Sequence, residues 1–286
     1  MLSNSQNYIN NKELVSKLLG FVDFNEAPLV IEIGPGKGII TDELIKKTSR
    51  VIAIEADQKL AHFLKGRYTN TQKLQIVQED ILKYNLPKEP FLIVSNLPFN
   101  ITADIVRKIT APDSKLKSAY LILQKEAAIK FLGAPHAHSP LLSHFLQINF
   151  SIEQLMLIPS SNYSPRPKFD TAFVSFSRKS SPVFEGAQAE QFKDFLVYIF
   201  ERRKPLIKDA LKSIMSNLQV KIALEKLGIP QDRNIKKVLF NEWVQIFNTF
   251  LIHTPEKSKK TIARAYQKLL EEQSGLKKEH RTRRDF

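Results

Sequence analysis

Short apolar runs separated by turn residues fill the first 180 residues of the chain. The runs that predict buried strands are 28–33, 50–55, 74–77, 91–94 and 173–176. A run of roughly four to eight apolar residues bounded by turns is typical of a strand that is buried on both faces. Helical spacing follows several of the runs, and this alternation predicts an α/β fold with a Rossmann-like sheet.

After residue 180 the apolar residues recur every three or four positions, which is helical spacing. The segments predicted as helices are 191–200, 204–218, 220–227, 241–250 and, more weakly patterned, 262–270. We therefore predict three parts. Residues 1–180 form the cofactor-binding catalytic domain, 181–254 form a smaller all-α domain, and 255–286 form a basic C-terminal extension that is partly disordered.

A glycine-rich loop follows the first predicted strand. It contains Gly34, Gly36 and Gly38 and leads into a helical pattern over 39–45. Glycines let the backbone turn sharply and pass close to a ligand. The spacing is Gly-x-Gly-x-Gly, so the dinucleotide fingerprint Gly-x-Gly-x-x-Gly is not met. The loop therefore favours a nucleoside cofactor without a pyrophosphate.

Acidic residues follow the next two predicted strands. Glu55 comes 19 residues after Gly36, where a carboxylate can accept hydrogen bonds from ribose hydroxyls. Asp80 can accept from an adenine amino group, with Ile81 packed on the ring. Ligands in open α/β sheets bind along the carboxyl ends of the strands, so this series predicts a nucleoside-binding edge.

The exit loop of the fourth predicted strand reads Asn96-Leu97-Pro98-Phe99. An aromatic amine is a weak nucleophile because its lone pair is delocalised into the ring. The Asn96 side-chain oxygen and the Leu97 carbonyl could grip its N–H groups and aim the lone pair at an activated methyl group. Pro98 stiffens the loop, and Phe99 offers a face on which an extruded base can stack. The loop indicates methyl transfer to the amino nitrogen of a base.

These motifs resemble those of the ribosomal RNA adenine N6-dimethyltransferases, in both the Erm and the KsgA/Dim1 branches, over residues 6–252. The resemblance implies a Rossmann-like S-adenosylmethionine-dependent methyltransferase sheet with a smaller all-α C-terminal domain. The residues that would bind S-adenosyl-L-methionine by this match are Gln6, Asn7, Tyr8, Gly34, Gly36, Gly38, Glu55, Asp80, Ile81 and Asn96.

The family's Phe-x-Pro-x-Pro-x-Val-(Asp/Asn) segment resembles residues 163–170. By this match Tyr163 would sandwich the target adenine together with Phe99. Phe99 stands where Tyr is usual, and Tyr163 stands where Phe is usual. Both exchanges keep an aromatic face, so the resemblance implies that Asn96, Leu97, Pro98, Phe99 and Tyr163 form the catalytic site.

The two branches differ in several segments. Leu97 is usual in the KsgA branch, whereas residues 103–109, 119–123 and 240–247 look more like Erm, and the KsgA lead-in Lys/Arg-x-x-Gly-Gln-Asn is missing before Gln6. The resemblance thus favours N6-methylation of a 23S rRNA adenine, which confers macrolide-lincosamide-streptogramin B resistance. The alternatives are KsgA-type dimethylation of two adjacent adenines near the 3′ end of 16S rRNA, a non-catalytic RNA-binding or assembly factor, and a methyltransferase acting on DNA or protein amines.

The net charge of +14 is unevenly spread. Residues 1–178 hold 21 Lys and Arg against 16 Asp and Glu, net +5, whereas residues 179–286 hold 22 against 13, net +9. Such clusters suit contacts to the phosphates of ribosomal RNA, naked or in a pre-ribosomal particle. The candidate RNA-binding residues are Arg107, Lys108, Arg166, Lys168, Arg202, Arg203, Lys204, Lys236 and Lys237.

Several classes of protein do not fit the sequence. The chain has no cysteine, so disulfides and thiolate metal sites are impossible. Its six histidines show no metal-ligand spacing, and His136 and His138 are expected in a surface loop. No secretory signal precedes the first strand, and no apolar stretch approaches the roughly 20 residues of a membrane span. We expect a cytoplasmic monomer without a metal.

Overall fold

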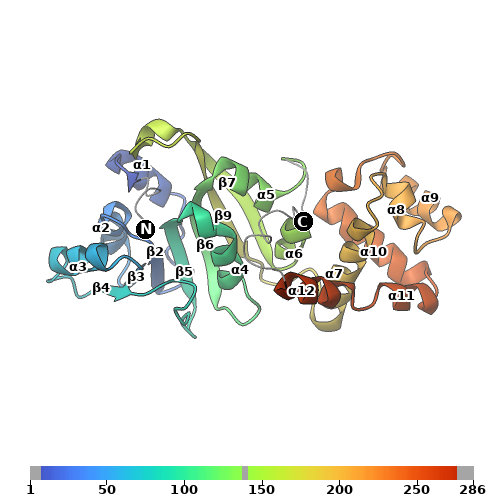
Figure 1. The fold of residues 1–286 in the computed structure, drawn as a ribbon, viewed down its shortest axis with the longest axis horizontal. Helices are drawn as coiled ribbons and strands as arrows, with labels where there is room; N and C mark the ends of the chain where they lie inside the picture. Colours follow the sequence, from blue (N-terminus) through green and yellow to red (C-terminus); the bar gives the residue numbers. More distant parts are fainter. Residues whose placement is uncertain (1–7, 137–140, 276–286) are drawn as a thin grey trace. The chain divides into compact units, whose positions relative to one another are not determined.

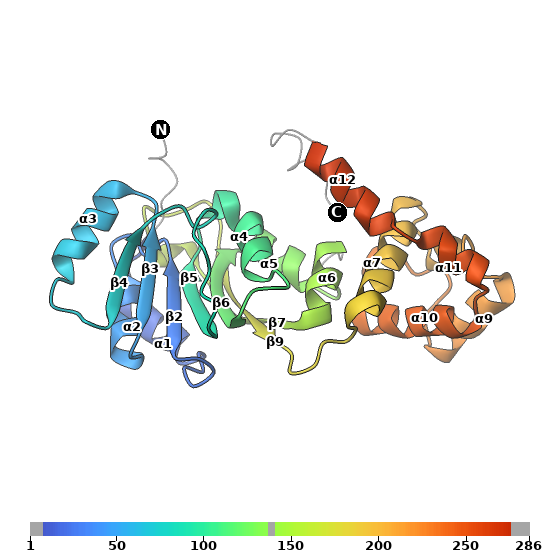
Figure 2. The same cartoon turned by 90° about the horizontal axis from the view of Figure 1, so that it is seen from below.

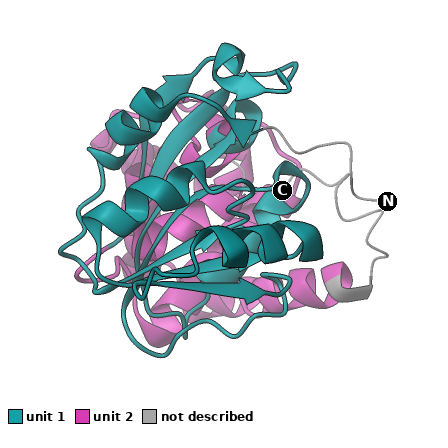
Figure 3. Cartoon of the chain, turned by 90° about the vertical axis from the view of Figure 1, so that its left-hand side faces the viewer, with its two compact units in different colours: residues 1–128, 151–178 teal, residues 129–150, 179–286 magenta. Residues whose placement is uncertain are grey.

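The computed structural model describes residues 8–136 and 141–275. The chain forms two compact units, and the first contains residues 1–128 and 151–178 (Figure 3). The second contains residues 129–150 and 179–286. The segment 129–150 thus belongs to the second unit, although the sequence pattern groups it with the first 180 residues.

Unit 1 is built on a seven-stranded sheet with the strand order β4-β3-β2-β5-β6-β9-β7 (Figure 1). Its strands are β2 (Leu29–Ile33), β3 (Val51–Glu55), β4 (Leu74–Gln78), β5 (Phe91–Asn96), β6 (Leu116–Gln124), β7 (Phe150–Ile158) and β9 (Thr171–Arg178). The first five pair in parallel, whereas β9 runs antiparallel to β6. The predicted α/β class with a Rossmann-like sheet is confirmed.

The order of the strands explains where a ligand can bind. From β2 the chain adds β3 and β4 on one side, and it then returns to add β5 and β6 on the other. β2 and β5 are therefore neighbours, with Val30 opposite Leu92 and Ile31 opposite Ile93. Such a reversal opens a crevice at the carboxyl ends of the two strands, and the glycine loop and the Asn96 loop begin at these ends.

The helices of unit 1 follow the strands in alternation. They are α1 (Lys12–Leu19), α2 (Ile39–Lys47), α3 (Gln58–Arg67) and α4 (Thr102–Ile109), with the 3₁₀ turns η1 (Phe99–Ile101) and η2 (Ser160–Asn162). Helix α5 (Lys125–Leu132) begins in unit 1 and ends in unit 2, because the boundary falls between Ala128 and Ile129. Helices α1 and α2 pack against each other beside the sheet (Figure 2). Their apolar faces, together with those of β2, β3, β5, β6 and β9, form one continuous core.

A second, very short sheet in unit 1 joins two distant segments. β1 (Tyr8–Ile9) runs antiparallel to β8 (Tyr163–Ser164), with Tyr8 opposite Ser164 and Ile9 opposite Tyr163. Asn10 N–H also donates to the Asn162 carbonyl at 3.1 Å. The segment expected to close over the cofactor is thereby tied to the segment expected to contact the target base.

Unit 2 consists of helices in the described residues. They are α6 (Leu141–Asn149), α7 (Gly186–Glu201), α8 (Ile207–Leu211), α9 (Asn217–Lys226), α10 (Phe240–His253), α11 (Glu256–Ile262) and α12 (Ala265–Gly275), with the 3₁₀ turn η3 (Ile235–Lys237). Their core is rich in aromatic rings. Trp243, Phe192, Phe195, Phe247 and Phe250 are fully buried, and their side chains hold α7 and α10 together.

Part of the basic extension belongs to this helical core. Ile262, Ala265 and Leu269 are buried in the same cluster as Trp243, and α12 packs along α7 (Figure 1). The predicted single helix over 262–270 is wrong, because Arg264 adopts a left-handed φ of 66° that separates α11 from α12. The end of the extension, 276–286, lies outside the described residues, as do His138 and Pro140.

The predicted helix over 204–218 is wrong as well. Leu206 is extended and bridges to Asn234, and Ile207 N–H donates to the Arg233 carbonyl at 2.9 Å. These bonds delay the helix until Ile207, and Ser216 then begins α9 with a capping box. None of the helices in the described ranges is long and apolar enough to cross a lipid bilayer.

Candidate active site

The ends of β2 and β5 are fastened to each other and to the rest of the sheet. The Ser95 hydroxyl donates to the Ile33 carbonyl at the end of β2. Leu97 N–H donates to the Ile122 carbonyl of β6 at 3.2 Å, and the Leu97 side chain is buried. The Asn96 loop therefore leaves the sheet in a fixed direction beside the glycine loop.

The glycine loop needs glycine for two reasons. Gly34, Gly36 and Gly38 all have positive φ, of 66°, 58° and 86°, a region that costs other residues free energy. A Cβ on Gly36 would lie 2.6 Å from the Tyr8 ring, and a Cβ on Gly38 would lie 2.5 Å from the Tyr68 hydroxyl. The loop is thus a backbone cradle that side chains would fill.

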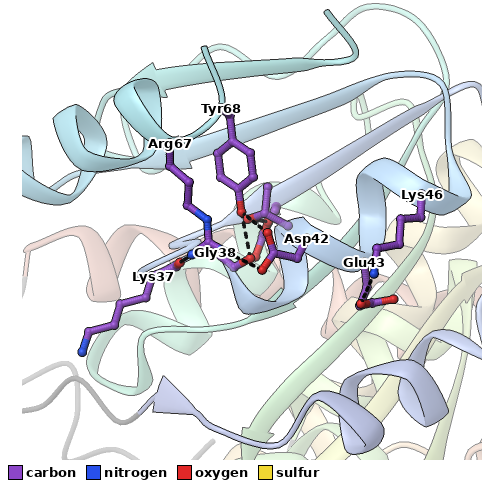
Figure 4. Close-up of polar contacts among 9 residues, drawn as sticks. Lys37, Gly38, Asp42, Glu43, Lys46, Arg67 and Tyr68 are labelled. Carbon is purple, nitrogen blue, oxygen red and sulfur yellow. Dashed lines mark hydrogen bonds and ion pairs between the residues drawn. The ribbon is translucent and has the colours of Figure 1, made fainter. Parts of the chain in front are cut away.

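A polar network connects this loop to α2 and to the C-terminal end of α3 (Figure 4). The Arg67 guanidinium donates to the Lys37 carbonyl at 2.9 Å and pairs with Asp42. The Tyr68 hydroxyl lies 2.6 Å from the Asp42 carboxylate and 3.1 Å from the Gly38 carbonyl. Sequence reasoning missed these residues, because their partners are two backbone carbonyls and the Asp42 carboxylate, which lie 25 to 30 residues earlier in the chain.

Glu55, at the end of β3, is hydrogen-bonded to the glycine loop. Its carboxylate accepts from Gly36 N–H at 3.2 Å and from Asp57 N–H at 2.9 Å. The residue is only 5% exposed, and burial raises the pKa of its carboxyl. Burial and the charges of Glu55 and Asp57 also raise the pKa of Tyr8. The Lys37 ammonium lies 5.3 Å from the centre of the Tyr8 ring.

A small cavity of about 60 Å³ lies between the glycine loop and Asn96. Tyr8 and Glu32 also line it, and Glu32 was not among the predicted site residues. Glu32 is 1% exposed, and the Thr41 hydroxyl donates to its carboxylate at 2.6 Å. Burial raises the pKa of Glu32 to about 8. The sequence signal was a single charged residue within the buried run Leu29–Ile33.

The predicted adenine contacts follow β4. The Asp80 carboxylate accepts from Leu82 N–H at 2.9 Å, and the Asp80 carbonyl accepts from Lys83 N–H. Ile81 is buried, and neither Asp80 nor Ile81 lines the small cavity. Gln6 and Asn7, the other predicted cofactor contacts, lie outside the described residues.

The aromatic rings beside the catalytic loop differ from the expected pair. The ring centroid of Phe99 lies 5.2 Å from that of Phe169, in an edge-to-face arrangement, and both rings are partly exposed. Tyr163 is 3% exposed, packs in the core with Ile9, and has its hydroxyl 2.7 Å from that of Thr171. The described ring of Tyr163 therefore presents little surface to a base, and its predicted stacking role stays untested.

Hydrogen bonds fix the segment that carries Phe169. Arg166 Nε donates to the Ser160 hydroxyl at 3.1 Å, and the Asp170 carboxylate accepts from Ser160 N–H at 2.8 Å. Lys125 N–H donates to the Asp170 carbonyl at 3.1 Å. The chain is thus fixed on both sides of Phe169. The resemblance to the family did not single out Phe169, because Val is usual at this position.

The predicted RNA contacts lie in both units. In unit 1, Arg107 is exposed and paired with Asp104, the Lys108 ammonium donates to the Leu82 carbonyl, and Lys168 is exposed. In unit 2, the exposed candidates are Arg202, Arg203, Lys204, Lys236 and Lys237. Among the described residues, no group of three or more His, Asp or Glu side chains could hold a metal ion.

The site fits a nucleoside cofactor with a cationic end. The glycine cradle admits a ligand close to the backbone. The Glu55 carboxylate favours a positively charged or hydroxyl-bearing group, and the buried carboxyl of Glu32, with its raised pKa, can exchange hydrogen bonds with such a group. Asn96 lines the same cavity, and its side-chain amide oxygen can accept hydrogen bonds. These features define a methyltransferase of the class that uses S-adenosylmethionine.

Comparisons with known proteins agree with this class. Residues 2–251 match the family model described as ribosomal RNA adenine dimethylase. An rRNA adenine N-6-methyltransferase of Lysinibacillus sphaericus is 32% identical over 252 residues, covering 88% of this chain and 97% of the relative. A ribosomal RNA small subunit methyltransferase A of Mycoplasma mobile is 30% identical over 246 residues, covering 83% and 95%.

A solved structure shares the fold. The crystal structure of the 23S rRNA methyltransferase ErmE matches with a TM-score of 0.80 at 24% identity, covering 85% of this chain and 99% of that one. The chain belongs to the ribosomal RNA adenine dimethylase family. It is an rRNA adenine N6-methyltransferase whose methyl donor is S-adenosylmethionine, so the resemblance and the cofactor predicted from the sequence are confirmed.

Proposed function

We propose that this enzyme methylates an adenine of 23S rRNA and thereby confers resistance to macrolide, lincosamide and streptogramin B antibiotics. The observation that carries the proposal is the Erm-like segment 240–247, which begins α10. Its residues Trp243 and Phe247 are fully buried in the core of unit 2, so the likeness concerns residues that determine the fold of this unit. The missing KsgA-type lead-in before Gln6 supports the same branch.

The cofactor would be held at the crevice between β2 and β5. The loop of Gly34, Gly36 and Gly38 would pass close to it, and Glu55 would accept from its ribose hydroxyls. Asp80 and Ile81 would contact its adenine, and Tyr8 would lie over its methionine end, to which the family resemblance also assigns Gln6 and Asn7. The cofactor supplies a methyl group that is already activated as a sulfonium, so no general base is needed before attack.

The target adenine would be held by the Asn96 loop. The Asn96 side-chain oxygen and the Leu97 carbonyl would accept from its amino group and orient the nitrogen lone pair. The bond from Leu97 N–H to Ile122 and the ring of Pro98 fix the loop before the substrate arrives. Positioning of this kind can supply roughly 7–11 kcal/mol of the barrier.

Two rings would support the base. Phe99 would stack on the extruded adenine, and the edge-to-face contact with Phe169 would hold the Phe99 ring in place. Tyr163, as a member of the same segment, would keep β8 against β1 through its buried ring. The enzyme would act as a monomer, with the helical domain 181–254 and the basic residues named above binding rRNA phosphates.

A second candidate is the KsgA-type reaction, dimethylation of two adjacent adenines near the 3′ end of 16S rRNA. It is favoured by Leu97, which is usual in that branch, and by the relatives named small subunit methyltransferase A, of which one is 30% identical.

A direct assay separates the two candidates. The protein is incubated with labelled S-adenosylmethionine and, separately, with naked 23S rRNA, naked 16S rRNA and immature small subunits. An Asn96→Ala variant serves as the matched control, since it should bind the cofactor without transferring the methyl group. Label in one adenine of 23S rRNA, with macrolide tolerance on expression, supports the proposal. Label confined to 16S rRNA or the immature subunit overturns it in favour of ribosome maturation.

A further inference from the structure

The helical unit contains a second cavity, and its walls come from two distant parts of the chain. It has a volume of about 400 Å³ and lies between the C-terminal end of α7 and the chain that joins α11 to α12. Tyr198, Glu201 and Arg202 line one wall, and Lys268 lines the other together with the turn 261–265. The second wall lies beyond residue 251, where the match to the family model ends.

The two walls are fixed to each other. Asp194 on α7 accepts from Arg264 N–H at 2.9 Å and from Tyr266 N–H at 2.8 Å, so both oxygens of its carboxylate hold the turn. Asp194, Tyr198 and Glu201 are spaced at i, i+4 and i+7, which places them on one face of α7. The buried side chains of Ile262, Ala265 and Leu269 hold the turn from the other side. The cavity is therefore a built feature of unit 2.

The polar groups in this cavity suit an anion. The Arg202 guanidinium lies 4.2 Å from the centre of the Tyr198 ring and hydrogen-bonds to its hydroxyl, which fixes its direction. Lys268 adds a second cation from α12. One acid, Glu201, also lines the cavity and opposes an anion through its negative charge. Burial and then the charge of Glu272 raise the pKa of its carboxyl, with Arg202 and Lys268 acting in the opposite direction.

The basic residues around the cavity extend this positive surface. Arg203 and Lys204 follow Arg202 in sequence and are exposed, and Arg264 is exposed in the turn. The net charge of residues 179–286 is +9. A polyanion such as RNA, with a phosphate at every nucleotide, would meet several of these cations at once.

We propose that this cavity binds a backbone phosphate of the rRNA substrate, at a nucleotide other than the target adenine. The proposal rests on the binding of rRNA by this enzyme, and it adds a contact that the extension supplies. Arg202 and Lys268 donate to the phosphate oxygens, the Tyr198 hydroxyl orients Arg202, and Glu201 weakens binding by repulsion. The extension therefore enlarges the footprint of the enzyme on its substrate.

The test measures RNA affinity by fluorescence anisotropy at a series of salt concentrations. Two transcripts are used, one from the large-subunit region and one from the small-subunit 3′ region, and the one that accepts label in the methylation assay is analysed. Lys268→Gln and Arg202→Gln should each reduce the slope of log affinity against log salt by about one. Each should weaken binding about threefold to tenfold at roughly 0.1 M salt.

Glu201→Gln distinguishes a phosphate from other ligands by the sign of its effect. Removing a carboxylate next to a phosphate should tighten RNA binding about threefold, whereas removing an acceptor for a base amino group would weaken it. Lys226→Gln, an equal charge change at an exposed residue of α9, is the matched control. A salt slope for Lys268→Gln equal to that of Lys226→Gln, or weaker binding by Glu201→Gln, overturns the proposal.

Cofactor affinity and the choice of rRNA serve as separate readouts. All four substitutions are at exposed residues of unit 2, so S-adenosylmethionine affinity should stay within about twofold of the unaltered enzyme. Transfer to 16S rather than 23S rRNA would contradict the proposed antibiotic resistance function but leave the phosphate site testable on the 16S transcript. If Lys268→Gln and Arg202→Gln leave the salt slope unchanged on the transcript that accepts label, only the phosphate site is contradicted.

Discussion

The two units bury ionisable side chains in opposite ways. Unit 1 buries carboxylates next to hydrogen-bond donors: Thr41 donates to Glu32, and two backbone N–H groups donate to Glu55. Unit 2 buries an imidazole among rings, because His144 lies next to Phe240 and Trp243 with ring centroids at 6.3 and 6.5 Å. Among the described residues, neither nitrogen of His144 has a hydrogen-bond partner.

This difference in the buried ionisable groups reflects the two roles of the units: unit 1 has a ligand-binding edge, whereas unit 2 has a densely packed core. In unit 1 the buried acids lie at the ends of strands, where they position a loop and can meet a cationic ligand. In unit 2 the imidazole serves as one more flat ring, and burial lowers its pKa to about 3. The two units are therefore expected to respond differently to substitution and to pH.

The largest effect is expected in unit 1, at the catalytic loop. Asn96→Ala removes the proposed acceptor for the target amino group, so methyl transfer should fall at least about 1,000-fold, or about 4 kcal/mol. Cofactor affinity, measured by calorimetry, should change less than about threefold. Asn70→Ala, at an exposed residue after α3, is the control. Substantial turnover by the Asn96 variant would remove the catalytic assignment.

The second effect concerns the glycine cradle. Gly36→Ala should weaken S-adenosylmethionine binding about 100-fold, because the new methyl group meets the Tyr8 ring at 2.6 Å and a left-handed φ costs roughly 1–2 kcal/mol. Gly66→Ala on α3 is the matched control, since nothing lies within 4 Å of a Cβ there. Equal affinities for the two variants would mean that the loop does not hold the cofactor.

The third effect belongs to unit 2 and to acid pH. The pKa of His144 is lower in the folded chain than in the unfolded chain, so its protonation favours unfolding below a pH of about 6.5. From pH 6.5 to 5 the free energy of unfolding should fall by about 2 kcal/mol on this account. Urea unfolding followed by the fluorescence of Trp243, the single Trp of the chain, measures it.

A pair of variants isolates this contribution. His144→Leu should remove the loss between pH 6.5 and 5, whereas His253→Leu, at an exposed residue of α10, should retain it. An unchanged pH dependence in the His144 variant would show that other groups cause the acid sensitivity of unit 2.

The fourth effect is a loss of stability of unit 1 as the pH rises, which is the reverse of the acid sensitivity of unit 2. The pKa of Glu32 is raised from 4.5 to about 8 by burial, so the stability it contributes is complete below pH 4.5 and is lost as the pH rises to 8. Between pH 6 and 7 the loss should be about 1 kcal/mol. Hydrogen exchange of β2 and β5, corrected for intrinsic rates, measures it. Glu32→Gln should abolish the loss, and Glu26→Gln, at an exposed residue, should not.

The smallest effect tests the ring that the family resemblance did not single out. Phe169→Val restores the usual family residue and removes the contact with Phe99, so kcat/KM for RNA should fall about fivefold, or about 1 kcal/mol. Cofactor affinity should not change. Phe63→Val, at an exposed residue of α3, is the control. Full activity of the Phe169 variant would show that Phe99 needs no support from this ring.

The strands β2, β3 and β5 were predictable because they are nearly uninterrupted apolar runs. β6 and β7 were not among the predicted strands, and β7 is interrupted by Glu153 and Gln154. The predicted strand 28–33 agrees with β2 to within one residue, whereas the predicted strand 91–94 ends two residues before β5 does. The order of these strands along the chain led to the ligand edge. The pairing of Tyr8–Ile9 with Tyr163–Ser164 was not predictable, since a strand of two residues has no period.

The other features that the sequence did not predict depend on tertiary contacts. The contact of Phe99 with Phe169 depends on hydrogen bonds of Ser160 that fix a loop, and no spacing rule reports them. The break between α11 and α12 depends on a left-handed Arg264, whose N–H is held by Asp194 some 70 residues earlier. Helical periodicity continues through this break, so the pattern alone predicts one helix.

The discontinuous make-up of unit 2 has a consequence for synthesis on the ribosome. Residues 129–150 leave the exit tunnel before 151–178, yet their partners in the helical core extend to Leu269. Unit 1 can therefore complete its sheet while Leu141, His144 and Ile148 still lack the aromatic rings that will cover them. Folding of the two units during translation is accordingly interleaved, and premature termination at residue 251 would release a chain with a finished catalytic half and an unfinished helical one.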